Sequence, residues 1–291
     1  MTDTPLVGFI GLGQMGGPMA GNIAKAGFSV LCFDTAGTDK LLPEKCKAAT
    51  SLADVVRNTD TVFLSLPDGK ISNAVAKDIA AVENRRATVV VDLSTIGPDA
   101  AKSAAATLKE AGITYIDAPV SGGRAGAIKG TITLMWGGPK AELERHRAIA
   151  ESFCGNPFHV GDEPGQGQAV KLVNNFLSAT AMVATSEAML FGLSQGLDMK
   201  TMLDVVNVST GQNTATSDKF PNRVLPGTFD AGFYAELLNK DVQLYFENAK
   251  KAGTPTHVST EVAGIWRRCI EAFEPRTDFT RVYEFMRDKD K

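Results

Sequence analysis

The sequence predicts an α/β domain with a doubly wound, mainly parallel sheet, followed by an all-helical domain. Three observations carry this prediction. The chain has 291 residues, enough for two domains at about 150 residues each. Short β-rich runs alternate with helical patterns up to residue 160. After Gln166 the β-branched runs nearly vanish and helical periodicity takes over.

Several runs rich in β-branched and aromatic residues have the length and flanking turns of buried strands. They occupy residues 6–10, 30–33, 61–66, 88–93, 115–118, 131–136 and 158–160. Parallel strands are joined by right-handed helical crossovers, and their ligands bind outside the carboxyl ends of the strands. We therefore expect the loops that follow these strands to carry the function.

A turn-rich segment, residues 161–165, separates the two parts of the chain, so we place the domain boundary there. The predicted domains are residues 1–164 and residues 165–291. Helical periodicity over residues 168–195 predicts one long helix of about 40 Å. Glycine and proline predict breaks in the helical domain at residues 211–213, 221–232 and 253–255.

The composition is that of an ordinary globular protein with a small-molecule ligand. Hydrophobic residues make up 44% and charged residues 22%, and the net charge is −3. No block of Lys and Arg is present, which argues against nucleic acid or a membrane surface as partner. The four cysteines lack metal-ligand or disulfide spacing, so we expect no metal site. The start of the chain does not resemble a signal peptide, and residues 169–193 carry too many polar groups for a membrane span. We expect a cytoplasmic location.

A glycine-rich segment follows the first predicted strand and opens a helix. It reads Gly11, Leu12, Gly13, Gln14, Met15 and Gly16, the G-x-G-x-x-G spacing of a dinucleotide site. In that pattern the first glycine allows a tight turn, the second lets the pyrophosphate approach the backbone, and the third allows close helix packing. The helix N-terminus then offers free N–H groups to the phosphates.

Asp34 ends the second predicted strand, about 20 residues after the loop, where a carboxylate can accept hydrogen bonds from ribose hydroxyls. A carboxylate there would repel the 2′-phosphate of NADP, and residues 35–38 contain no Arg to compensate. We therefore predict NAD rather than NADP. The alternative is that Asp34 only caps a turn or helix.

Three further loops follow predicted strands. Leu66 and Pro67 end the third strand and Thr95 follows the fourth, so these residues should line the same crevice unless they serve only as turns or caps. After the fifth strand, Ser121, Gly122 and Gly123 offer a hydroxyl and exposed backbone N–H groups that suit a carboxylate. The alternative for that segment is a flexible loop.

Lys171 and Asn175 lie four residues apart on the predicted long helix, so they share one face. A partly desolvated lysine can exchange protons near neutral pH, and the amide beside it can fix a hydrogen bond. The alternative for Lys171 is a solvated charge at a helix start.

These motifs together resemble the β-hydroxyacid dehydrogenase family. This family includes 3-hydroxyisobutyrate dehydrogenase, tartronate semialdehyde reductase and the succinic semialdehyde/glyoxylate reductases. The resemblance covers essentially the whole chain and rests on residues 8–22, 117–130, 165–175 and 240–242. It implies a Rossmann domain and a set of roles: Lys171 as acid/base, Ser121, Gly122 and Gly123 on the substrate carboxylate, Asn175 orienting the substrate, Leu66, Pro67 and Thr95 on the cofactor, and Lys240 closing over the site.

The expected activity is therefore hydride transfer between NAD and a small β-hydroxy acid or its semialdehyde, with no metal. The alternatives are an NADP-preferring semialdehyde, glyoxylate or imine reductase, and a non-catalytic NAD(H)-binding sensor. A hydrolase using Ser121 is disfavoured because that serine lies in no G-x-S-x-G motif. The family resemblance also implies a homodimer or homotetramer, which we expect to associate through the helical domain.

Overall fold

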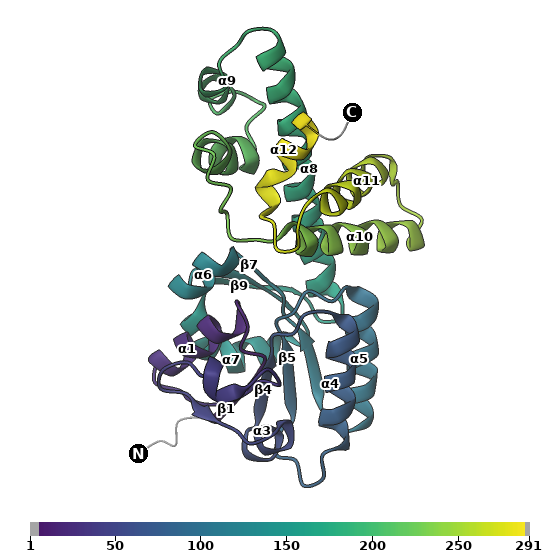
Figure 1. The fold of residues 1–291 in the computed structure, drawn as a ribbon. Helices are drawn as coiled ribbons and strands as arrows, with labels where there is room; N and C mark the ends of the chain where they lie inside the picture. The colour runs from purple at the N-terminus through teal and green to yellow at the C-terminus, as the bar shows by residue number, and fades with distance from the viewer. Residues whose placement is uncertain (1–5, 289–291) are drawn as a thin grey trace. The chain divides into compact units, whose positions relative to one another are not determined.

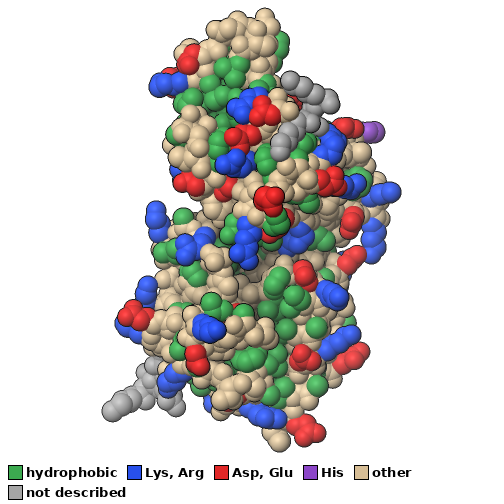
Figure 2. All heavy atoms as spheres, viewed as in Figure 1, with side chains coloured by type: hydrophobic (Ala, Val, Ile, Leu, Met, Phe, Trp, Pro, Cys, Tyr) green, Lys and Arg blue, Asp and Glu red, His purple; other side chains and the backbone are tan. Residues whose placement is uncertain are grey.

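A computed structural model describes residues 6–288 of the chain (Figure 1). It forms two compact units, the first ending at Lys171 and the second beginning at Leu172. On the face drawn in Figure 2, Lys and Arg side chains are interspersed with Asp and Glu on each unit. This mixture agrees with the net charge of −3.

The first unit is built on one sheet with the strand order β3-β2-β1-β4-β5-β6-β8-β7, and β9 pairs with β8. The strands are β1 (Leu6–Ile10), β2 (Ser29–Phe33), β3 (Lys47–Ala48), β4 (Thr61–Leu64), β5 (Val89–Asp92), β6 (Thr114–Asp117), β7 (Val120–Ser121), β8 (Ile132–Gly137) and β9 (Cys154–Gly161). The strands from β3 to β6 run parallel, β8 is antiparallel to β6 and β7, and β9 is parallel to β8. The predicted mainly parallel sheet is confirmed.

Helices cover both faces of this sheet (Figure 1). They are α1 (Gly16–Lys25), α2 (Thr38–Leu41), α3 (Leu52–Asn58), α4 (Gly69–Ala81), α5 (Pro98–Glu110), α6 (Gly123–Lys129) and α7 (Lys140–Phe153). Strand alternation divides the core between the faces: Phe63 of β4 joins the cluster that contains Met19 of α1. Its neighbours Val62 and Leu64 join the cluster that contains Ile79 of α4. Both layers are therefore continuous apolar cores, as doubly wound sheets require.

The regular elements of the second unit, residues 172–288, are all helices, joined by loops that include one isolated β-bridge between Tyr234 and Asp278. The long helix α8 (Gln166–Ser194) leads into this unit and is followed by α9 (Met199–Val206), η1 (Ala215–Val224), α10 (Ala235–Lys251), α11 (His257–Ala272), η2 (Phe279–Arg281) and α12 (Val282–Asp288). Its core surrounds the fully buried Trp266, whose Nε1 donates to the carbonyl of Ala179 at 3.4 Å. The predicted all-helical domain is confirmed.

Two details differ from the sequence prediction. Pro221 was expected to lie in a break, yet it sits inside η1, a π-helix. We also predicted that the polar residues of the segment 169–193 exclude a membrane span. By length and composition alone, however, α8 is long and apolar enough to cross a membrane. Core helices of soluble proteins pass the same test, and Ala179 and Met182 of α8 belong to the helical core.

Candidate active site

The glycine-rich loop joins β1 to α1 and is shaped by backbone contacts. Gly11 has φ +94°, and a Cβ there would overlap the carbonyl of Ser65. A Cβ on Gly16 would overlap the carbonyl of Gly11. The space beside Gly13, by contrast, is open. The loop is thus closed tightly at both ends and leaves room at Gly13, as a backbone that receives a pyrophosphate requires.

The N-terminus of α1 is suited to an anion. No side chain caps it, and its first turn carries no acidic residue. The N–H groups of Gly17 and Met19 already donate to the carbonyls of Gly13 and Met15, and Pro18 has no N–H, so a phosphate would be received by the loop and by Gly16 at the start of the helix. A groove of about 410 Å³ runs beside the loop and along α1. Its lining includes Leu12, Gly13, Gln14, Lys25 and Arg124. These features fit the pyrophosphate of a dinucleotide.

Asp34 lies at the end of β2, next to the loop, and is partly exposed. Its Oδ2 accepts from the backbone N–H of Leu12 at 2.6 Å, and its Oδ1 accepts from Ala36 N at 2.7 Å. The turn-capping role that the sequence left as an alternative is therefore present. It coexists with a position beside the dinucleotide loop, because the same carboxylate holds the backbone of Leu12.

The loops after β4 and β5 lie at the same edge of the sheet, because these strands are parallel neighbours. The Ser94 hydroxyl accepts from the backbone N–H of Leu66 at 2.7 Å and joins the two loops. Pro67 is exposed, whereas Leu66 and Thr95 are partly buried. The structure thus brings the three predicted cofactor residues of these loops to one place.

Two buried carboxylates that the sequence analysis did not assign lie at this same edge. Asp92 and Asp117 end β5 and β6, are paired in register, and are both fully buried. Burial raises the pKa of Asp92, and it raises the pKa of Asp117 to about 7 against the opposing effect of backbone N–H donors. Burial likewise raises the pKa of Tyr115, whose hydroxyl donates to Asp92. The only signal for these carboxylates in the sequence is an Asp at the end of an apolar run.

The predicted carboxylate-binding segment spans β7 and the start of α6. Ser121 is partly buried, and Gly122 and Gly123 are exposed. Both glycines have positive φ, +131° and +62°, which favours glycine at these positions. Nothing lies near the position of a Cβ on Gly123. The segment is therefore an open turn with accessible backbone.

Lys171 and Asn175 lie one turn apart on the same face of α8, as predicted. Both are buried, with exposed fractions of 8% and 6%. The alternative of a solvated surface lysine is therefore wrong. Lysine side chains are rarely buried without a partner or a specific role, so the burial of Lys171 is consistent with a functional position.

In the second unit, Asp241 brings two of the predicted site residues together. Its Oδ2 accepts from Asn175 Nδ2 at 2.6 Å, and its Oδ1 lies 3.4 Å from Lys240 Nζ. The carboxylate is buried, and Asn175 donates to its Oδ2, whereas its Oδ1 makes no hydrogen bond within the described residues and has only the nearby charge of Lys240. The sequence placed Asp241 in a matching block without a role, because its pairing with Asn175 spans 66 positions.

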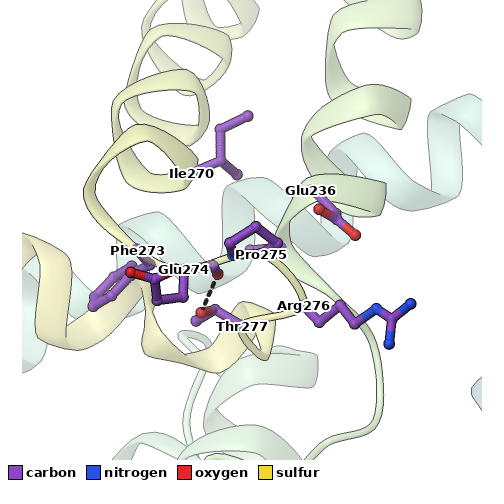
Figure 3. A pocket seen from close by; sticks show the side chains of 8 residues that line it. Glu236, Ile270, Phe273, Glu274, Pro275, Arg276 and Thr277 are labelled. Carbon is purple, nitrogen blue, oxygen red and sulfur yellow. Dashed lines mark hydrogen bonds between the residues drawn. The ribbon is translucent and has the colours of Figure 1, made fainter.

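A separate pocket of about 120 Å³ lies in the second unit (Figure 3). It is formed around Ile270, Phe273 and Pro275, with Glu236 and Arg276 at its edge. It contains none of the predicted site residues. Among residues 6–288, no group of three or more His, Cys, Asp or Glu could hold a metal ion.

Comparison with known proteins covers nearly the whole chain. Residues 6–161 match the family described as the NAD binding domain of 6-phosphogluconate dehydrogenase. Residues 165–286 match the family described as NAD-binding of NADP-dependent 3-hydroxyisobutyrate dehydrogenase.

Individual relatives agree. The NAD-dependent L-serine dehydrogenase of Pseudomonas aeruginosa is 35% identical over 96% of this chain and 97% of its own. The 2-(hydroxymethyl)glutarate dehydrogenase of Eubacterium barkeri is 35% identical over 88% of this chain and 87% of its own. A solved structure of Mycobacterium tuberculosis 3-hydroxyisobutyrate dehydrogenase with L-serine superposes with a TM-score of 0.89, at 30% identity, over 98% of this chain and 99% of that one.

Proposed function

Because this chain belongs to the β-hydroxyacid dehydrogenase family and is an NAD-dependent oxidoreductase of that kind, we propose that it oxidises a small β-hydroxy acid to its semialdehyde, or catalyses the reverse. The observation that carries this proposal is the buried Lys171 on the same helical face as the buried Asn175. Bound NAD supplies a hydride acceptor, and NADH a donor, at the nicotinamide ring.

The named substrates of the relatives narrow the class. L-serine, 3-hydroxyisobutyrate and 2-(hydroxymethyl)glutarate each carry a hydroxymethyl group on the carbon next to a carboxylate. They differ only in the third substituent of that carbon. We therefore expect a 3-hydroxypropanoate substituted at carbon 2, recognised through the carboxylate and hydroxyl that these compounds share.

Each shared group has a proposed partner. Ser121, Gly122 and Gly123 receive the carboxylate through the serine hydroxyl and backbone N–H groups of an open turn. During oxidation Lys171 Nζ accepts the proton of the substrate hydroxyl while a hydride leaves the carbon that bears this hydroxyl. In reduction Lys171 returns that proton. Asn175, held by Asp241, orients the substrate, and Lys240 closes over the site.

The cofactor is assigned to the first unit. The loop from Gly11 to Gly16, with Leu66, Pro67 and Thr95 at the neighbouring strand ends, would hold it. The family matched by residues 165–286 is described as NADP-dependent, but the Asp34 carboxylate beside the loop disfavours a 2′-phosphate. NAD is therefore the proposed cofactor. All four cysteines are free thiols, which suits the cytoplasmic location that we propose.

An oxidation assay with a panel of acids tests this function. NADH formation is followed with NAD and 3-hydroxyisobutyrate, L-serine, glycerate, threonate or 4-hydroxybutyrate. We expect turnover with 3-hydroxyisobutyrate, L-serine and glycerate, and little with threonate, whose β-hydroxyl is secondary and would give a ketone. We expect none with 4-hydroxybutyrate, whose hydroxyl lies one carbon too far from the carboxylate. NADH binding without turnover of any acid in either direction would contradict the proposal and favour a sensor or an imine reductase.

We propose a domain boundary at Pro164/Gly165, and the break between the two family matches, between residues 161 and 165, supports it. We also propose a homodimer or homotetramer that associates through the helical unit. Large apolar side chains are exposed there, including Leu177 and, at 69%, Phe191. Light scattering should give the mass of an oligomer for the wild type and a lower mass for Phe191→Glu. Phe158→Glu, at a phenylalanine of the first unit that is 55% exposed, is the control and should keep the mass.

A further inference from the structure

The first turn of α8 is capped by a residue far away in sequence. Its N-terminal neighbour Gly165 has no side chain to act as a cap. Instead, the Asp117 carboxylate accepts from Gly165 N at 2.7 Å and from Gln168 N at 2.8 Å. Each oxygen serves one N–H group, so both must act as acceptors. An anion at this end also suits the helix dipole.

The contact between this turn and the sheet leaves no room for side chains at Gly137 and Gly167. A Cβ on Gly167 would overlap the carbonyls of Asp117 and Met135, and a Cβ on Gly137 would overlap the backbone N of Gly167. The turn therefore lies directly against the ends of β6 and β8. Small residues at these two positions make the close approach possible.

The Gln168 side chain forms a second link, to the loop after β5. It is fully buried, and its Oε1 accepts from the backbone N–H groups of Ile96 at 2.9 Å and Gly97 at 3.1 Å. Its Nε2 donates to the carbonyl of Ser94 at 2.9 Å. These three bonds bracket Thr95 on both sides. Since the Ser94 hydroxyl also binds Leu66 N, the link extends to the loop after β4.

Gln168, Lys171 and Asn175 follow the spacing i, i+3, i+7, so they form one buried stripe on α8. A helix fixed at Gln168 can neither rotate nor slide at the next turn without breaking the bonds to the loop. The position of the Lys171 backbone relative to Thr95 is therefore set by these contacts.

We infer that Asp117 and Gln168 are positioning residues for catalysis: they fix the start of α8 against the loops that hold the cofactor and so set where Lys171 meets the substrate. This inference rests on the proposed function of Lys171. Asp117 and Gln168 themselves touch no reacting atom. Burial raises the pKa of Asp117 to about 7 even though the N–H groups of Gly165 and Gln168 lower it.

The test compares Gln168→Met and Asp117→Asn with Thr59→Val. Gln168→Met keeps the side-chain volume but loses the three bonds to the loop, and Asp117→Asn keeps the shape but places a donor against an N–H group. Thr59 is fully buried just before the start of β4, at the opposite end of that strand from the loop that carries Leu66. Its hydroxyl donates to the carbonyl of Val55 in α3, so Thr59→Val removes one buried hydrogen bond away from the site. Each variant should lower Tm by about 2–4 °C.

The expected result separates position from stability. Gln168→Met and Asp117→Asn should lower kcat roughly 30- to 100-fold at saturating NAD and acid, with KM little changed. Thr59→Val should leave kcat unchanged. Hydrogen exchange, which needs no activity, should show faster exchange of the Gly165 and Gln168 amides in Asp117→Asn and not in Thr59→Val.

Loss of kcat no larger than in Thr59→Val would overturn the inference while leaving the proposed function intact. A fall in rate that is seen only at low NAD and disappears at saturating NAD would also overturn it, because it would mean that Gln168 only supports cofactor binding. Unchanged exchange at Gly165 and Gln168 in Asp117→Asn would overturn the capping role. A wild type that binds NADH but oxidises no acid would instead contradict the proposed function itself.

Discussion

Replacing Lys171 with alanine is expected to lower kcat for β-hydroxy acid oxidation by roughly 10³-fold, within the range of about 10² to 10⁴ that general acid–base catalysis contributes. The side chain is buried at 8% exposure, and water is a much weaker base than an amine, so a water molecule in the vacated space cannot readily replace it. The measurement is NADH absorbance under saturating substrates, with NADH affinity measured separately. That affinity should be unchanged, because the loop that holds the phosphates lies on β1 and α1.

Two comparisons make this result specific to proton transfer. Small primary amines added to Lys171→Ala should restore part of the rate, because they can occupy the vacated space and accept the proton. Lys109→Ala removes an exposed lysine of α5 and should behave as the wild type. Full activity in Lys171→Ala would show that the lysine transfers no proton, and a loss that appears only in KM would show that it binds substrate without transferring a proton.

The fold was predictable because its signals are local. A buried parallel strand needs a continuous apolar run, and each predicted run became a strand of the sheet. The strands β3 and β7 were missed because two residues are too few to show a period. Pro221 misled for a related reason. Proline argues against α-helical hydrogen bonding, but the wider π-helical turn of η1 includes it.

The site was only partly predictable, because some of its contacts join distant positions. The glycine loop, Lys171 and Asn175 have characteristic residue types and fixed spacing, so the sequence could propose them as site residues. Asp117 and Gln168 act through partners 48 to 74 positions away. No periodicity encodes such pairs. A buried carboxylate at a strand end becomes meaningful only when the structure shows which N–H groups it meets.

Cofactor choice is expected to reverse when Asp34→Ser is combined with Thr35→Arg. In the cofactor site that we propose, the 2′-phosphate of NADP would lie beside the partly solvated Asp34 carboxylate, whose negative charge would oppose it. The exposed Thr35 can accept an arginine without disturbing the core. A charge-assisted bond from arginine to phosphate contributes about 1.5–3 kcal/mol. The ratio of kcat/KM for NADP to that for NAD should therefore rise roughly 100-fold, since tenfold corresponds to about 1.4 kcal/mol.

The single variants separate the two jobs of Asp34. Because its Oδ2 also holds Leu12 N at 2.6 Å, Asp34→Ser alone should weaken NAD binding through the loop as well as the ribose, and should gain only modest NADP activity. Thr35→Arg alone should change little, because the carboxylate still opposes the phosphate. Unchanged selectivity in the double variant, with both cofactors binding, would show that Asp34 serves the loop and not the choice of cofactor. A reversed preference would mean that one carboxylate both shapes the loop and selects NAD.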